Sequence, residues 1–166
     1  TNSSLAAYPN LTCPVVEAPI GVLPGIGGAH ASVIYCAGND QVFHFLQDVI
    51  DEVVELFPSR YLHVGGDEAN KENWKKCPLC QQRIKDNQLK DEEALQSYFL
   101  KRINSYLKTK NRIMMGWDEV ADSEIPDGAI IMGWRGDGHA ALTAADQGHP
   151  IIMTPARKLY LIRYQG

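Results

Sequence analysis

Paired acids and tryptophans follow short apolar segments of this sequence. The stretch HVGGDE ends in Asp67 and Glu68, and the stretch GWDE ends in Asp118 and Glu119. A third stretch of the same kind, GWRG, contains Trp134. In pockets that bind sugars, aromatic rings stack on the apolar face of the ring and carboxyl groups act on the glycosidic bond. These residue types therefore indicate carbohydrate chemistry.

Each motif taken alone also has a structural explanation. A Gly-Gly-Asp-Glu stretch is typical of a turn followed by a helix cap, and a tryptophan is often an ordinary core residue. Two acid pairs and two Gly-Trp pairs at equivalent positions are harder to explain as caps. In addition, Gly65 and Gly66 allow a sharp turn and a close approach of a ligand to the backbone.

Apolar periodicity predicts which elements position these motifs. Short uniform apolar runs predict strands over 60–64, 112–117, 128–134 and 150–154. Apolar residues at three- and four-residue spacing predict helices over 40–57, 91–110 and 137–148, the first capped by Asn39 or Asp40 and the last ended by Gly148. The alternation predicts an α/β fold with a parallel sheet, whose functional residues gather at the carboxyl ends of the strands.

Composition limits the partners. The 166 residues are 45% hydrophobic and 22% charged, which suits one globular domain. A formal charge of -4 without a basic run argues against nucleic acid, and no apolar run approaches the roughly 20 residues that cross a bilayer. The first forty residues, rich in Gly and Pro, predict a long loop with room for one short strand. A polar loop with cysteines is expected before the second long helix.

The four cysteines leave several states open. Cys77 and Cys80 have the spacing of a zinc knuckle, and Cys13, Cys36 or His63 could complete four ligands. Because all-cysteine zinc sites usually show two such pairs, the pattern favours a disulfide or free thiols. No metal and no cofactor are therefore predicted.

The motifs together resemble a known family. HVGGDE resembles the H-x-G-G-D-E signature of glycoside hydrolase family 20, the β-N-acetylhexosaminidases, and GWDE and GWRG match its next two strand-end motifs in order and spacing. The stretches LAAYPNL and LFPSRYLHVGGDE add to the resemblance, which covers essentially the whole chain. It implies that residues 1–166 are a partial catalytic domain, with about four units of a (β/α)8 TIM barrel, roughly strands four to seven.

The resemblance also implies roles for single residues. Glu68 would be the general acid and later the base, and Asp67 would hold the 2-acetamido group of the substrate, whose carbonyl oxygen attacks the anomeric carbon. Trp117 and Trp134 would wall the acetamide pocket, and Tyr160 would hydrogen-bond the acetamide carbonyl.

Asp118 and Glu119 complete the predicted substrate-binding residues. The implied substrate is a glycan that carries terminal GlcNAc or GalNAc, and the implied parent protein is secreted, periplasmic or lysosomal. Ile162 departs from the family, which has aspartate at that position.

Two alternatives from other classes stay open. The first is a non-catalytic carbohydrate-binding or degenerate barrel domain, for which Ile162 is the best support. The second is a phosphate-binding α/β domain that uses the GIGG stretch at Gly25, although no helix is expected directly after it. Because four βα units leave open sheet edges, the chain by itself is expected to be inactive and could form a homo-oligomer through those edges.

Overall fold

The computed structural model describes residues 2–17 and 33–161. The GIGG stretch and Ile162 lie outside these residues. The chain divides into two compact units, each made of two segments. Unit 1 comprises Thr1–Val53 and Glu68–Phe99, and unit 2 comprises Val54–Asp67 and Leu100–Gly166.

Unit 2 contains a parallel sheet. Within the described residues, its strands are β1 (Tyr61–His63), β2 (Ile113–Trp117), β3 (Ile130–Gly133) and β4 (Ile151–Met153), paired in that order. All three strand pairs are parallel, and the register places His63 beside Met115 and Gly133 beside Met153. The four predicted strands and the α/β class are confirmed.

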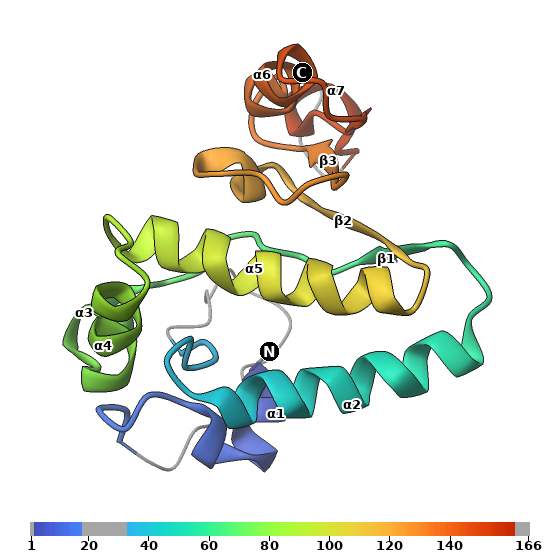
Figure 1. The fold of residues 1–166 in the computed structure, drawn as a ribbon. Coiled ribbons are helices and arrows are strands. Elements are labelled where there is room, and N and C mark those ends of the chain that lie inside the picture. Colours follow the sequence, from blue (N-terminus) through green and yellow to red (C-terminus); the bar gives the residue numbers. More distant parts are fainter. Residues whose placement is uncertain (1, 18–32, 162–166) are drawn as a thin grey trace. The chain divides into compact units, whose positions relative to one another are not determined.

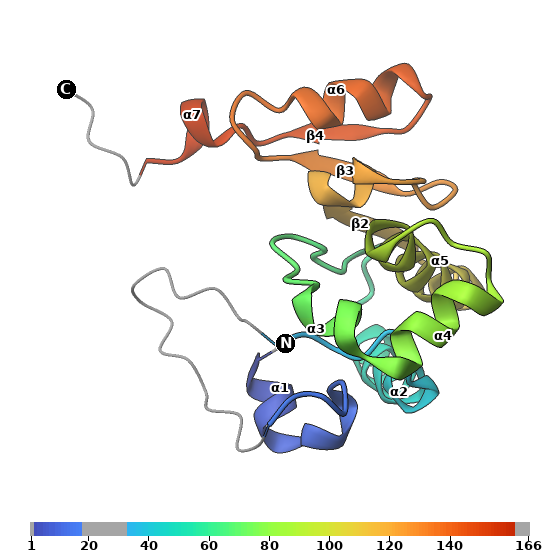
Figure 2. The same cartoon turned by 90° about the vertical axis from the view of Figure 1, so that its left-hand side faces the viewer.

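Helix α6 (His139–Asp146) covers β3 and β4 in unit 2 (Figure 2). Its buried Ala141 lies so close to Gly133 that a side chain at the glycine would overlap it. The helix is followed by Gly148 with φ +87°, so the predicted end is confirmed. Two short helices, η2 (Asp118–Asp122) and α7 (Ala156–Leu159), follow β2 and β4.

Two long helices begin in unit 1 (Figure 1). Helix α2 (Asp40–Leu56) is capped by Asn39, whose Oδ1 accepts a hydrogen bond from Gln41 N at 3.0 Å. Helix α5 (Glu92–Thr109) begins with the equivalent hydrogen bond from Ala94 N to Asp91 Oδ1, also 3.0 Å. Both predicted helices are confirmed within two residues at each end.

Two predicted loops of unit 1 contain short helices instead. The N-terminal segment forms α1 (Asn2–Ala7) and η1 (Pro9–Leu11), and the segment with Cys77 and Cys80 forms α3 (Glu72–Lys76) and α4 (Pro78–Asp86). The loop predictions are therefore wrong for these residues. Helices of three to nine residues show too few repeats for a clear apolar period. Proline at the first position of η1 and α4 is nevertheless a start signal.

Each unit has its own apolar core. In unit 2, Met114 and Ile131 of the central strands are fully buried, together with Leu107 of α5. In unit 1, aliphatic and aromatic side chains pack around sulfur; the buried residues are Leu5, Leu11, Cys13, Cys36, Ala37, Val42, Trp74, Cys77, Cys80 and Leu95.

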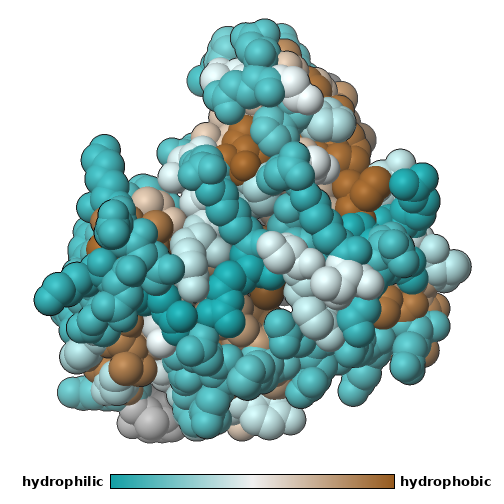
Figure 3. All heavy atoms as spheres, in the orientation of Figure 1, coloured by the Kyte–Doolittle hydropathy of each residue, from teal (hydrophilic) through white to brown (hydrophobic). Residues whose placement is uncertain are grey.

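Most of the surface in Figure 3 is hydrophilic, with hydrophobic side chains in separate areas. Apolar side chains are exposed on the outer strands of the sheet, including Tyr61 of β1 and Ile152 of β4. No helix within residues 2–17 and 33–161 combines the length and apolarity needed to cross a bilayer.

Candidate active site

The carboxyl ends of three neighbouring strands of unit 2 carry the predicted motifs. HVGGD begins in β1, GWDE begins in β2, and GWRG begins at the end of β3. The hydrogen-bond ladder continues past β1, because Trp117 N donates to Gly65 O at 2.9 Å. Parallel pairing therefore brings the ends of these strands to the same edge of the sheet.

The turn after β1 depends on two glycines. Gly65 has φ +78° and Gly66 has φ +100°, conformations that residues with a side chain rarely adopt. A Cβ atom on Gly66 would lie 2.8 Å from Val120 Cγ2, so η2 packs directly on this turn. The sharp turn predicted from the sequence is confirmed, and it sets the direction in which Asp67 leaves the sheet.

The side chain of His63, the last residue of β1, also lies at this edge of the sheet. Its ring lies edge-on to that of Trp117, with 4.8 Å between centroids, and its Nδ1 accepts a hydrogen bond from Gly65 N at 3.1 Å. The neutral ring therefore carries its proton on Nε2. Burial lowers the pKa of His63, and the negative charge of Asp67 partly opposes that shift. Sequence reasoning considered His63 only as a metal ligand; its place in the HVGGDE motif was the available signal.

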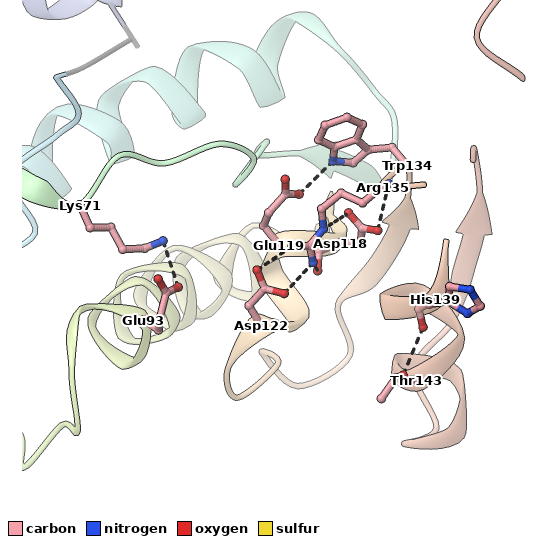
Figure 4. Close-up of polar contacts among 9 residues, drawn as sticks. All are labelled: Lys71, Glu93, Asp118, Glu119, Asp122, Trp134, Arg135, His139 and Thr143. Atoms are coloured by element: carbon pink, nitrogen blue, oxygen red, sulfur yellow. Dashed lines mark hydrogen bonds and ion pairs between the residues drawn. The ribbon is translucent and has the colours of Figure 1, made fainter. Parts of the chain in front are cut away.

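Trp134 and Tyr160 present aromatic faces in the same unit. Their rings are nearly parallel, at 15° with 6.4 Å between centroids. Trp134 Nε1 donates to Glu119 Oε2 at 3.0 Å, which fixes the indole plane (Figure 4). Burial raises the pKa of Glu119, while the Trp134 hydrogen bond acts in the opposite direction. The half-buried indole keeps part of its surface accessible for stacking.

Arg135 of GWRG connects this motif to GWDE through hydrogen bonds. Its Nε donates to Oδ1 of the fully buried Asp118 at 3.1 Å, and its backbone N donates to Oδ2 at 3.3 Å. The other end of the guanidinium donates to both carboxylate oxygens of Asp122, at 2.6 and 2.9 Å (Figure 4). Hydrogen bonding to Asp122 raises the pKa of Arg135. This network holds η2, and hence Glu119, against the end of β3. Arg135 was not predicted, although it lies in GWRG.

Glu68 opens the second segment of unit 1, directly after Asp67. It is exposed and has φ +49°, an uncommon conformation for a residue with a long side chain. The chain that follows is held within unit 1, because Asn70 Oδ1 accepts from Glu72 N at 3.0 Å and Lys71 pairs with Glu93 at 3.0 Å (Figure 4).

The predicted site residues thus fall into two sets. Unit 2 contains Asp67, Trp117, Asp118, Glu119, Trp134 and Tyr160, and unit 1 contains Glu68. Among those in unit 2, direct contacts join Trp134 to Glu119 and to Tyr160. Carboxylates beside aromatic faces can hold a sugar ring and move protons to and from its substituents.

The comparisons with known proteins agree on one family. A family model described as the catalytic domain of glycosyl hydrolase family 20 matches residues 1–166. A beta-hexosaminidase of Porphyromonas gingivalis is 46% identical over 165 residues, which are 99% of this chain and 21% of that protein. The chain therefore spans about a fifth of the length of this curated relative.

Solved structures show the same relationship. A beta-N-acetylhexosaminidase from Bacteroides fragilis is 38% identical with a TM-score of 0.76, over 90% of this chain and 29% of that one. A chitobiase from Flavobacterium johnsoniae is 29% identical with a TM-score of 0.82, over 93% of this chain and 24% of that one. The four parallel strands and their helices are consistent with part of a TIM barrel. The chain therefore belongs to glycosyl hydrolase family 20, and the match lies in the catalytic domain of that family.

Proposed function

We propose that this chain forms part of the catalytic domain of a β-N-acetylhexosaminidase, which removes terminal β-linked GlcNAc or GalNAc from glycans by a retaining, substrate-assisted mechanism. The observation that carries the proposal is the placement of three motifs at the carboxyl ends of adjacent parallel strands, in a chain of this family. A related structure is named as a beta-N-acetylhexosaminidase, which supports the same substrate class.

The first step needs both members of the acid pair. Glu68 donates a proton to the glycosidic oxygen as its bond to the anomeric carbon breaks. Asp67 accepts a hydrogen bond from the acetamide N–H, so that the acetamide carbonyl oxygen is oriented to form the new bond to that carbon. In the second step, Glu68 accepts a proton from water, which attacks the anomeric carbon and opens the cyclised intermediate.

The aromatic side chains restrict the acetamide to one orientation. We assign the walls of its pocket to Trp117 and Trp134 and a hydrogen bond to its carbonyl to Tyr160. Glu119 supports this arrangement by fixing the indole of Trp134. Because Asp118 is fully buried against Arg135, its geometry favours a supporting role; direct binding of substrate by Asp118 stays a prediction.

The experiment uses a complete enzyme that carries this sequence, with Glu68 replaced by glutamine. Turnover should fall by about 10²–10⁴-fold on chitobiose, whose leaving group needs protonation, and by less on 4-nitrophenyl N-acetyl-β-glucosaminide. Glu72→Gln is the matched control, because Glu72 is an exposed acid that pairs with Lys75 at 2.6 Å; it should leave both rates unchanged. Equal losses on the two substrates would contradict the role of Glu68.

The same assay tests the non-catalytic alternative. A carbohydrate-binding domain would retain affinity for GlcNAc and give no turnover even before substitution. We also propose that the 166-residue chain alone is inactive, since its described sheet has four strands where a barrel has eight. Release of 4-nitrophenol by that chain above a Glu68→Gln version of it would contradict this expectation.

A further inference from the structure

Four cysteine side chains meet in the core of unit 1. The Sγ atoms of Cys13, Cys36, Cys77 and Cys80 all lie within 4.8 Å of one another. Three of the separations are 3.7 Å, namely Cys13 to Cys80, Cys36 to Cys77 and Cys36 to Cys80. None of the four is in a disulfide, and each is at most 1% exposed.

These distances fit a metal ion better than bonded or isolated thiols. Four sulfurs arranged tetrahedrally at about 2.3 Å from Zn²⁺ are about 3.8 Å apart, close to the observed 3.7 Å. A disulfide would require a distance of about 2.05 Å between two sulfur atoms. Disulfides would also join the sulfurs in pairs instead of bringing all four together. A cluster of several iron atoms would hold the sulfurs farther apart.

We propose that Cys13, Cys36, Cys77 and Cys80 bind one Zn²⁺ ion as a structural site. Thiolate sulfur in a tetrahedral set of four is the donor arrangement that zinc adopts in closed sites. Zinc binds cysteine sulfur as the thiolate, so metal binding by this site is coupled to the release of thiol protons.

The chain builds this site from three separate segments. Cys77 and Cys80 flank the start of α4, where Pro78 occupies the first helical position. Cys13 follows η1, and Cys36 lies just before α2. The two latter segments are joined by the hydrogen bond from Cys36 N to Leu11 O at 2.9 Å.

Contacts around the sulfurs hold the turns that present them. Gly38 lies against the backbone of Leu79, so closely that a Cβ atom at this position would overlap the Leu79 carbonyl. Arg83 of α4 donates to Gly38 O at 3.1 Å and pairs with Asp40 at 2.9 Å. The start of α4, with Cys77 and Cys80, and the segment after Cys36 are therefore positioned by contacts that need no metal, as a preorganised site requires.

The surroundings indicate a structural role and not a catalytic one. All four cysteines belong to the apolar core of unit 1, so no coordination position faces solvent. A catalytic zinc keeps one position for water or substrate. The proposal does not depend on the hexosaminidase mechanism, since Glu68 lies nine positions before Cys77 and is exposed.

The first test measures metal and thiols in the 166-residue chain, purified without chelator. Mass spectrometry of the metal content should find about one zinc per chain, as expected for a single closed site. The four thiols should resist a thiol reagent until a chelator and denaturant are added. The intact mass of the denatured apoprotein should be that of four free thiols; a mass lower by four hydrogens would show two disulfides and overturn the proposal.

The second test replaces the metal and the ligands. When zinc in the unsubstituted chain is exchanged for Co²⁺, the protein should show the visible absorption of a tetrahedral thiolate complex. Because this measurement needs no substitution, it remains valid if a variant fails to fold. Cys80→Ser should lower zinc affinity by more than the roughly 10–100-fold that loss of an outer contact causes. His63→Ala should retain zinc, because His63 does not belong to the four-residue cluster.

Three further outcomes would refute the site. These are a chain that contains no stoichiometric metal while its thiols react freely, a chain that contains iron in place of zinc, and a Cys80→Ser variant with unchanged zinc affinity.

Discussion

The two units of this chain are organised around different chemistry. Unit 2 is built on a parallel sheet, and the fully buried carboxylate of Asp118 accepts hydrogen bonds from Arg135. The part of unit 1 that the structure describes contains helices and no strand, and its core surrounds four sulfurs. The difference shows how a short segment can be fixed in two ways, by a ladder of backbone hydrogen bonds or by a few side chains that converge on one point.

Because of this contrast, the two units should respond differently to substitutions. In unit 2, a substitution that removes one charge from the network of Asp118 and Arg135 should lower the free energy of unfolding and leave the proposed metal site unchanged. In unit 1, crowding near the sulfurs should act on the proposed metal site. Substitutions in each unit can therefore break or sharpen the comparison.

The largest effect is expected for Asp118→Asn. The amide offers one acceptor where the carboxylate offers two, so a buried donor of Arg135 loses its partner. The free energy of unfolding should fall by about 3 kcal/mol, the lower end for a broken buried ion pair, because Asp122 still pairs with Arg135.

Asp122→Asn is the matched control, since Asp122 binds the same guanidinium from an exposed position. Its cost should stay below about 1 kcal/mol. Urea unfolding measures both values, and hydrogen exchange of β2 and β3 peptides locates the change. Equal costs for the two variants would show that burial of Asp118 does not decide the stability of the network.

A smaller effect is expected for Gly38→Ala. The added methyl group overlaps the backbone at Leu79, and shifting well-packed groups typically costs about 1–3 kcal/mol. Zinc should also leave this variant faster when a chelator is added. Gly128→Ala is the comparison in unit 2, because Gly128 has φ +73° but open space around it; it should lower stability without changing zinc release. An unchanged rate of zinc release in Gly38→Ala would show that crowding at this turn does not affect the proposed metal site.

The smallest effect concerns Trp134→Phe and the pKa of Glu119. Loss of the indole hydrogen bond, which favours the charged carboxylate, should raise that pKa further above its usual range. A group whose pKa is higher in the folded state contributes stability at low pH, and this contribution is lost as the pH rises through the folded pKa. Carboxyl NMR titration of both proteins measures the shift. A pKa that stays constant or falls would contradict the role given to the hydrogen bond.

Periodicity was enough to predict most of unit 2. The strands and long helices contain enough apolar repeats to be recognised, and parallel pairing follows from their alternation. The grouping of GWDE with GWRG followed from the rule that strand ends share an edge. The role of Arg135 did not, because nothing in its sequence neighbourhood indicates that its guanidinium turns back to Asp118.

Apart from α2 and the start of α5, the organisation of unit 1 could not be predicted from periodicity. Helices α1, α3 and α4 are too short to show an apolar repeat. Of the four cysteines, only Cys77 and Cys80 are close in sequence, whereas Cys13 and Cys36 lie far from them and from each other. Their meeting depends on contacts between distant segments, such as Cys36 with Leu11 and Gly38 with Leu79. The expected disulfide or free thiols rested on spacing alone, and spacing does not report on such contacts.

The left-handed conformation of Glu68 links stability and evolution at one position. A long side chain at φ +49° carries a backbone cost that glycine would relieve, roughly 1–3 kcal/mol for a strained residue. If Glu68 has the proposed role, selection for a more stable protein and selection for a faster one oppose each other here. A mutational library screened only for thermal tolerance would then be expected to enrich glycine at position 68 and to discard the proton donor.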